Sequence, residues 1–147
     1  MLPLEDALAQ MLNQLPFPTK TETLALTEAA DRVCAEDVIS PINVPSFDNS
    51  AMDGYAVRLA DLQQSMTLSI AGKSFAGNPF QGEWVAQSAV RIMTGAMIPE
   101  GADAVVMQED VTVNEDGSVT FSALPKANQN IRRIGEDVKK GDVVLHQ

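Results

Sequence analysis

The chain has little of what many catalytic centres are built from: its 147 residues include one cysteine, one histidine, one tryptophan and one tyrosine. The single thiol, Cys34, cannot form an internal disulfide, and its neighbours Val33 and Ala35 predict a small buried side chain and not a nucleophile. The only histidine, His146, is the penultimate residue. This chain is therefore expected to supply neither a His-containing metal cluster nor a Ser-His-Asp triad.

Positive charge is also scarce, since 10 Lys and Arg residues stand against 20 Asp and Glu residues and leave a net charge of −10. A surface of this sign repels a phosphate backbone, so we expect no nucleic-acid partner. No apolar run approaches the roughly 18 residues that a membrane-spanning helix requires, and the first residues lack both the cationic and the apolar region of a signal peptide. We therefore expect a cytoplasmic protein with no membrane partner.

The residues that are present, 45% of them hydrophobic and 20% charged, suffice for one folded domain or a domain with a small appendage. Apolar residues recur at helical spacing between Pro3 and Pro16, which predicts one amphipathic helix. A short strand over 23–26 and a helical turn over 27–31 are expected next. From Pro41 onwards glycine and proline recur and helical periodicity is lost, so the remainder is predicted to be mainly β.

The β-rich part is predicted to form a small closed or half-closed sheet with glycines at its turns. The Asp116-Gly117 pair lies between two alternating apolar runs and is the strongest hairpin signal in the chain. A strand over 143–145 would end the sequence with an uncovered edge, which predicts that the chain is a piece of a longer protein. The expected fold class is α+β. The candidate strands are 52–57, 67–71, 89–93, 104–108, 111–114 and 119–122, and a short helix is expected over 58–63.

Three segments are more polar or richer in glycine than packing requires, and the first contains Asp48, Asn49, Ser50 and Asp53. Carboxylate oxygens in such a loop can position a water molecule or a nucleophile, or hold a hydrated Mg²⁺. Gly54, directly after Asp53, lets a ligand or another backbone segment come close. The structural alternative is an Asx-turn, in which Asp48 and Asn49 bond to their own backbone.

The other two segments offer a hydroxyl group and positive charge. One predicted strand ends in Thr94 and a glycine, where a hydroxyl and free backbone N–H groups could bind a phosphate or an oxyanion; the alternative is an ordinary exit from a strand. Arg132 and Arg133 are adjacent, and guanidinium groups suit the same anions. The alternative there is a surface ion pair with Glu136 or Asp137. If the stretch is extended, only one of the two arginines can face a site.

A family resemblance rests on three sequence blocks: the run DNSAMDGYA at 48–56, RIMTGA at 91–96 with PEGADAVV at 99–106, and NIRR at 130–133 with GED at 135–137. In order and spacing these blocks resemble the N-terminal half of the molybdopterin molybdenumtransferases, the molybdenum insertases of molybdenum-cofactor biosynthesis that include bacterial MoeA and the E domain of gephyrin. The match spans essentially the whole chain. Three ordered blocks are far more specific than any single motif.

The resemblance implies an elongated N-terminal domain formed by residues 1–45 and 131–147, into which a β-rich, barrel-like domain of residues 46–130 is inserted. It also implies a pterin-binding α/β domain and a small β-barrel, both absent from this chain. Family members form homodimers, in which the second subunit completes the cleft that holds the pterin substrate. The fragment is therefore expected to be inactive alone.

The implied reaction is a Mg²⁺-dependent hydrolysis of adenylylated molybdopterin, in which AMP leaves and molybdate is coordinated by the dithiolene sulfurs. Asp53 matches the family aspartate that is tied to activity, Thr94 matches a polar site residue, and Arg132 matches an arginine suited to the anionic substrate. These three are the candidate catalytic residues. We expect the aspartate, the threonine and one of the two arginines to lie along one connected surface.

No residue of this chain is assigned as a metal ligand. A second hypothesis is a noncatalytic dimerisation or scaffold module of the same family, which would tolerate loss of the candidate aspartate. A third is a generic β-domain whose glycines serve only turns.

The candidates for binding the pterin substrate are Asp48, Asn49, Ser50 and Arg133.

Overall fold

The computed structural model describes residues 2–16 and 20–147. The chain divides into two compact units, one comprising Met1–Val38 with Leu145–Gln147 and the other comprising Ile39–Val144. None of the helices in the described residues is long and apolar enough to cross a bilayer.

The first unit contains the predicted amphipathic helix, α1 (Leu4–Gln14). It begins after a proline, has acidic residues in the first turn where they favour the helix dipole, and ends at Leu15, whose backbone is extended before Pro16. No residue of α1 is buried, and apolar side chains such as Leu4 (79% exposed) and Met11 (68%) are open to solvent. Among the described residues, α1 therefore gains little from packing.

The strand predicted over 23–26 is not formed. Residues 20–25 have no regular structure, and a 3₁₀ turn, η1 (Leu26–Glu28), begins one residue before the predicted helical turn over 27–31. A strand requires a partner for its backbone groups, and the described part of the chain provides none here. Cys34 is only half-buried, so the prediction of a small buried side chain is wrong in its degree of burial.

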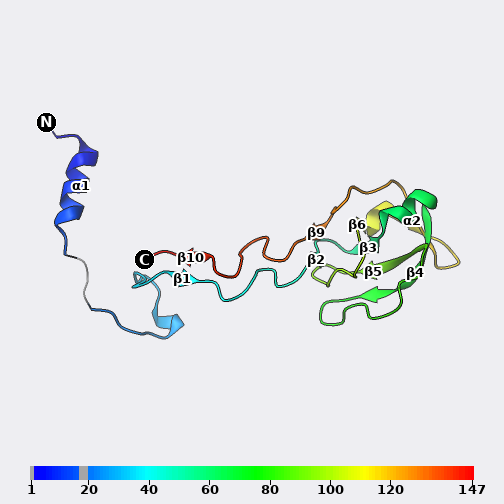
Figure 1. The fold of residues 1–147 in the computed structure, drawn as a ribbon, viewed down its shortest axis with the longest axis horizontal. Coiled ribbons are helices and arrows are strands. Elements are labelled where there is room, and N and C mark those ends of the chain that lie inside the picture. The colour runs from blue at the N-terminus through cyan, green and yellow to red at the C-terminus, as the bar shows by residue number, and fades with distance from the viewer. Residues whose placement is uncertain (1, 17–19) are drawn as a thin grey trace. The chain divides into compact units, whose positions relative to one another are not determined.

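The second unit is built on a six-stranded sheet with the strand order β6-β3-β5-β4-β8-β7. Neighbouring strands are antiparallel except β4 and β5, which run parallel with a bulge between Ile70 and Gly72. The sheet curls into a half-barrel (Figure 1), and the fold is α+β, as predicted. The strands are β3 (Gly54–Val57), β4 (Thr67–Ser74), β5 (Ser88–Ile92), β6 (Ala104–Met107), β7 (Val111–Val113) and β8 (Val119–Phe121).

All six predicted strands are confirmed, with small shifts at their ends. The predicted hairpin joins β7 to β8: Gly117 has a φ of +81°, which glycine adopts without strain, and the Asp116 carboxylate accepts a hydrogen bond from the Ser118 N–H at 2.9 Å. Gly54 opens β3, and a Cβ there would lie 1.9 Å from the carbonyl oxygen of Val106 on β6. The close approach predicted at Gly54 is therefore made by another backbone segment.

The two faces of the curled sheet contribute to separate hydrophobic clusters, because successive strand residues point to opposite faces. Tyr55 of β3 packs in one cluster with Leu62, and the next residue, Ala56, belongs to the other. Leu62 lies on α2 (Leu59–Gln64), which confirms the helix predicted over 58–63.

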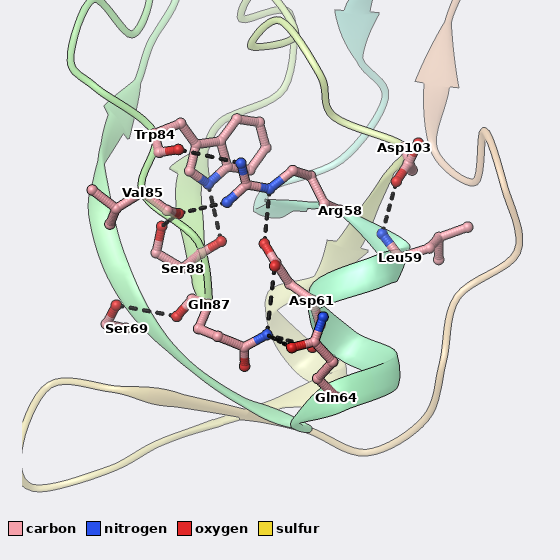
Figure 2. Close-up of polar contacts among 10 residues, drawn as sticks. All are labelled: Arg58, Leu59, Asp61, Gln64, Ser69, Trp84, Val85, Gln87, Ser88 and Asp103. Carbon is pink, nitrogen blue, oxygen red and sulfur yellow. Dashed lines mark hydrogen bonds and ion pairs between the residues drawn. The ribbon is translucent and has the colours of Figure 1, made fainter.

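Arg58 joins the start of α2 to the segment that precedes β5 (Figure 2). Its guanidinium lies 4.7 Å from the centre of the Trp84 ring, pairs with the Asp61 carboxylate at 2.7 Å, and donates to the backbone carbonyls of Trp84 and Val85. The Trp84 N–H donates in turn to the Ser88 carbonyl at 2.9 Å. Trp84 is therefore a packing anchor.

Two segments, 39–50 and 131–144, run side by side where the chain enters and leaves the sheet (Figure 1). The strand predicted over 143–145 is confirmed, and it is paired. The insertion predicted for residues 46–130 stays a prediction. The chain forms two two-stranded sheets here: β2 (Asn49–Ser50) pairs antiparallel with β9 (Ile131–Arg132), and β1 (Val38–Ile39) pairs with β10 (Val143–Leu145).

Candidate functional site

Asp53 and Thr94 are bonded to each other across 41 positions of sequence. The Oδ1 atom of Asp53 accepts two hydrogen bonds from Thr94, one from the backbone N–H at 2.8 Å and one from the hydroxyl at 2.7 Å. Asp53 immediately precedes β3, whose antiparallel pairing with β5 places its first residue beside the end of β5. The Thr94 donors hold the pKa of the Asp53 carboxyl below its ordinary value, and the charge of Arg91 adds to this effect. The carboxylate is therefore ionised at neutral pH.

The backbone N–H groups after β5 are engaged within the protein. The Thr94 N–H donates to Asp53, the Gly95 N–H donates to the Ser50 carbonyl at 2.8 Å, and the Ala96 N–H donates to a carbonyl of its own turn at 3.0 Å. The free N–H groups expected at this strand end are therefore not present at residues 94–96. Of the groups predicted to bind an anion at this strand end, only the Thr94 hydroxyl remains, and it already donates to the Asp53 carboxylate.

Asp48 and Arg133 form a second polar pair. One carboxylate oxygen of Asp48 accepts the backbone N–H of Ile134 at 2.7 Å, and the other pairs with the Arg133 guanidinium. The Ile134 N–H lowers the pKa of the Asp48 carboxyl, partial burial opposes this, and Arg133 reinforces the lowering. The Asx-turn alternative is wrong for Asp48, because its partners lie 85 and 86 positions away. The alternative ion pair of Arg133 with Glu136 or Asp137 is likewise replaced by the pair with Asp48.

The remaining predicted residues lie on β2 and β9, where Asn49 faces Arg132 in the ladder. Arg132 is exposed, and its guanidinium has no hydrogen bond or ion pair to another described residue. Asn49 is buried and donates to the Phe47 carbonyl at 3.3 Å, which agrees with the alternative of local bonding. Ser50 is fully buried and donates to the Met52 carbonyl at 2.6 Å. Ser50 can therefore act on a ligand only through the backbone that it shapes.

The two polar pairs are connected through the backbone of β2, which is bonded on one side to the turn after β5 and on the other to β9. The Ser50 N–H, for example, donates to the Ala96 carbonyl at 3.0 Å. Across the described residues, no hydrogen bond or ion pair joins Asp53 to Arg132 or Arg133. The convergence of these groups on one ligand therefore stays a prediction.

Sequence patterns did not single out Arg91 and Gln108, which hold the backbone around Asp53. The Gln108 N–H donates to the Asp53 carbonyl at 3.0 Å, and Arg91 donates to the Gly54 carbonyl at 2.7 Å. Both contacts depend on the pairing of β3 with β5 and β6, which is a long-range property of the chain. The one local signal was an arginine inside an otherwise apolar strand.

A metal ion would require more ligands than this site offers. Across residues 2–16 and 20–147, no group of three or more His, Cys, Asp or Glu side chains could hold one. Both site carboxylates, Asp48 and Asp53, already accept hydrogen bonds from protein donors. Mg²⁺ usually binds through one or two carboxylates together with substrate phosphates and water. The residues present therefore do not form a complete Mg²⁺ site, and none of them is assigned as a ligand.

Known proteins resemble the chain in both sequence and structure. The family model described as the MoeA N-terminal region (domain I and II) matches residues 2–147. The chain is 80% identical to the molybdopterin molybdenumtransferase of Haemophilus influenzae over 147 residues, which are 100% of this chain and 36% of that protein. It is 40% identical to the molybdopterin molybdenumtransferase of Bacillus subtilis over 134 residues, 86% of this chain and 31% of that protein.

A crystal structure of the molybdopterin biosynthesis MoeA protein from Pyrococcus horikoshii OT3 matches with a TM-score of 0.84 and 38% identity, covering 100% of this chain and 40% of that one. The chain spans about a third of the length of the curated relatives it matches. The resemblance read from the three sequence blocks is confirmed, because the family model extends over almost every residue and the fold agrees. This chain belongs to the MoeA N-terminal region family.

Proposed function

We propose that this chain is the N-terminal part of a molybdenum insertase, which forms molybdenum cofactor from adenylylated molybdopterin and molybdate, releases AMP and requires Mg²⁺. The names of its relatives support a molybdopterin molybdenumtransferase. The observation that carries the proposal is the bonding of Asp53 to Thr94, which holds an ionised carboxylate in a fixed orientation at a half-buried position. The proposal keeps the cytoplasmic location expected from the sequence.

In this proposal Asp53 is the catalytic carboxylate. Both hydrogen bonds from Thr94 end on Oδ1, so they orient the group without occupying Oδ2. A carboxylate with a lowered pKa accepts protons or orients a polar group, and it does not donate a proton at neutral pH. It is thus suited to orient the water that displaces AMP. Mg²⁺, for which the residues of this chain form no complete site, would supply positive charge when bound in the complete protein.

Arg132 is proposed to bind the anionic substrate, because its guanidinium is exposed and unpaired with respect to the described residues. A guanidinium matches phosphate oxygens with two parallel donors. Arg133, by contrast, is paired with Asp48 and acts on the site through the position of β9. The binding roles expected for Asp48, Asn49, Ser50 and Arg133 then consist mainly in shaping the backbone beside Arg132.

The test is the substitution Asp53→Asn in the complete protein, with Asp116→Asn as a matched control. Both carboxylates accept a backbone N–H and a hydroxyl on a single oxygen, Asp53 from Thr94 and Asp116 from Ser118. Asparagine can accept the same bonds but carries no charge. We expect Asp53→Asn to slow AMP release by about 100-fold or more, and Asp116→Asn to leave the rate unchanged.

Melting temperatures separate catalysis from folding. Both variants should melt close to wild type, because size and hydrogen bonding are retained. AMP release at the wild-type rate in Asp53→Asn would refute the catalytic assignment of Asp53. A rate loss of equal size in both variants would show that the effect belongs to the lost charge in general.

A homodimer is part of the proposal, as the family resemblance implies. The chain is about a third of its relatives' length, and one wall of a cleft seldom binds a small molecule well. The 147-residue chain alone should therefore release no AMP from adenylylated molybdopterin, with molybdate and Mg²⁺ present. Turnover by the purified chain would contradict this expectation. The second subunit and the further domains are expected to complete the cleft.

The exposed apolar side chains of α1 favour a second candidate function, a noncatalytic dimerisation or scaffold module. Leu4 is 79% and Met11 68% exposed, which leaves an apolar stripe for another surface to cover. Sedimentation of the 147-residue chain and of a Met11→Glu variant tests this candidate. A wild-type dimer that Met11→Glu dissociates supports it, whereas a monomeric wild type at high concentration argues against it.

A further inference from the structure

Arg91 is held in one orientation by a ring contact and by hydrogen bonds from both terminal nitrogens, one of them at 3.3 Å to the carbonyl of its neighbour Ile92. It lies on β5 opposite Tyr55 of β3, and its guanidinium carbon is 5.0 Å from the centre of the Tyr55 ring. Its two terminal nitrogens donate to the Gly54 carbonyl at 2.7 Å and to the Gln108 side-chain oxygen at 2.5 Å. A guanidinium that is stacked on a ring and bonded through both arms has little freedom left. The Arg91 guanidinium is therefore engaged by groups of the protein and is not free to bind a ligand.

Two of the hydrogen-bonding partners of Arg91, Gly54 and Gln108, adjoin Asp53. Gly54 is the next residue of the chain, and Gln108 donates its backbone N–H to the Asp53 carbonyl at 3.0 Å. Gly54 also packs directly against the backbone of β6, which limits how the segment can shift. Arg91 thus links the two backbone neighbours of Asp53, while Thr94 holds the carboxylate.

We infer that Arg91 is a positioning residue for Asp53: through Gly54 and Gln108 it fixes the backbone that presents this carboxylate to the substrate. The inference rests on the proposed catalytic role of Asp53 and extends it to a residue outside the three predicted ones. Lysine cannot replace arginine here, because it has a single nitrogen and no planar face with which to span two acceptors while stacked on a ring. The positive charge also favours the ionised carboxylate.

Arg58 provides a matched control. Its guanidinium also lies over an aromatic ring, Trp84, and donates to backbone carbonyls and a side-chain oxygen (Figure 2). Its contacts join α2 to the segment before β5, and in the described part of the chain none of them reaches Asp53. Arg58→Lys and Arg91→Lys therefore remove the same chemical group from two places, of which only one adjoins the candidate site.

Amide hydrogen exchange in the 147-residue chain reports on the position of Asp53 without any substrate. The backbone amides of Thr94 and Gln108 both donate to Asp53 and serve as the reporter amides. The Gly95 amide lies beside Thr94 but donates to β2, so it serves as the reference amide. A displaced Asp53 loosens the reporter amides and leaves the reference amide in place.

In Arg91→Lys we expect both reporter amides to exchange about tenfold faster relative to the reference amide, the loss expected for a weakened hydrogen bond. In Arg58→Lys that ratio should stay at its wild-type value. Reporter amides that keep their wild-type ratio in Arg91→Lys would overturn the inference, because Arg91 would then serve packing alone.

Kinetics of the complete protein supply the second readout. Arg91→Lys should lower kcat for AMP release about tenfold and change KM for adenylylated molybdopterin less than about twofold, since a misplaced carboxylate affects the transition state more than binding. Arg58→Lys should retain the wild-type kcat. Where Asp53→Asn has lost activity, a wild-type kcat in Arg91→Lys would overturn the inference.

The two readouts also separate the inference from the proposed function. If the reporter amides respond to Arg91→Lys while Asp53→Asn releases AMP at the wild-type rate, the catalytic role of Asp53 fails and its positioning by Arg91 stands. If Asp53→Asn is inactive and the reporter amides keep their wild-type exchange ratio in Arg91→Lys, the proposed function stands and the inference on Arg91 fails.

Discussion

Replacing Gly54 by alanine should detach an edge of the sheet beside the candidate site. The added Cβ would lie 1.9 Å from the carbonyl oxygen of Val106 and 2.8 Å from its carbonyl carbon, whereas Cβ contacts in proteins stay beyond 3.0 Å. The Val106 backbone must therefore withdraw by about 1 Å or more. No flexible side chain can absorb this shift, because the clashing atoms belong to the main chain. Since β6 is an edge strand, its withdrawal breaks its pairing with β3.

We expect Gly54→Ala to reduce the free energy of unfolding by about 2–4 kcal/mol. Forcing a methyl group into a packed position costs about 1–3 kcal/mol, and each hydrogen bond lost between β3 and β6 adds about 1 kcal/mol. A small domain is stable by about 5–15 kcal/mol, so the variant should still fold. Urea unfolding followed by circular dichroism measures the difference, and the thermal midpoint should fall by about 10 °C.

Gly117→Ala is the control for the loss of glycine itself. Gly117 has a φ of +81° with no atom within 4 Å of its added Cβ, so alanine meets backbone strain but no clash. That strain costs about 1–2 kcal/mol. At Gly54 the predicted cost comes from the clash. A Gly54→Ala variant as stable as the wild type, or clearly more stable than Gly117→Ala, would refute the argument.

Three further stability predictions follow from single contacts. Folding lowers the pKa of the Asp48 carboxyl, so the ionised carboxylate stabilises the fold at pH values above the pKa of the unfolded carboxyl, and this contribution is lost as the pH falls through the folded pKa. The difference in the free energy of unfolding in urea between wild type and Asp48→Asn should therefore shrink from neutral pH to about pH 3. A constant difference would contradict this. Leu62→Ala, at a side chain 2% exposed, should cost about 2–4 kcal/mol in urea unfolding, and a cost under about 1 kcal/mol would mean that the core refills. Asp116→Ala should lower the urea midpoint slightly, because two Ser118 donors lose their acceptor, and an unchanged midpoint would show that the hairpin does not need it.

The elements that local patterns predict well are those whose physics is local. The period of apolar residues and the flanking prolines suffice for α1, and the Asp116-Gly117 turn suffices for the hairpin. The strand expected over 23–26 fails for the opposite reason, since four residues cannot form a strand without a partner elsewhere in the chain. The parallel pairing of β4 with β5 has no local signal either.

The sequence predicted residues of the candidate site but not the contacts between them. Asp53 and Thr94 could be named from the sequence blocks, but their contact depends on the register of β3 against β5, which no local pattern specifies. The same register brings Arg91 to Gly54. The Asx-turn alternative for Asp48 failed because a carboxylate bonds equally well to its own backbone or to a distant segment, and only the fold decides between them.

Arg132 and Arg133 show most clearly how adjacent residues of one type can differ in function. Their alanine variants should separate binding from stability. Arg133→Ala removes an ion pair whose side chains are 50% and 32% exposed, so we expect a loss of at most about 1 kcal/mol in urea unfolding. Arg132 has no such partner in the described part of the chain, and Arg132→Ala should leave the unfolding midpoint unchanged.

For the kinetics of the complete protein we expect the opposite order of effects, with the larger loss in Arg132→Ala. Arg132→Ala should lower kcat/KM for adenylylated molybdopterin about tenfold or more, because an exposed guanidinium is the group that can meet the substrate's phosphate oxygens. Arg133→Ala should change kcat/KM less, since its guanidinium is occupied by Asp48. A wild-type kcat/KM in Arg132→Ala would mean that the substrate does not reach this face of β9. A larger kinetic loss in Arg133→Ala would mean that the ion pair opens when the substrate binds.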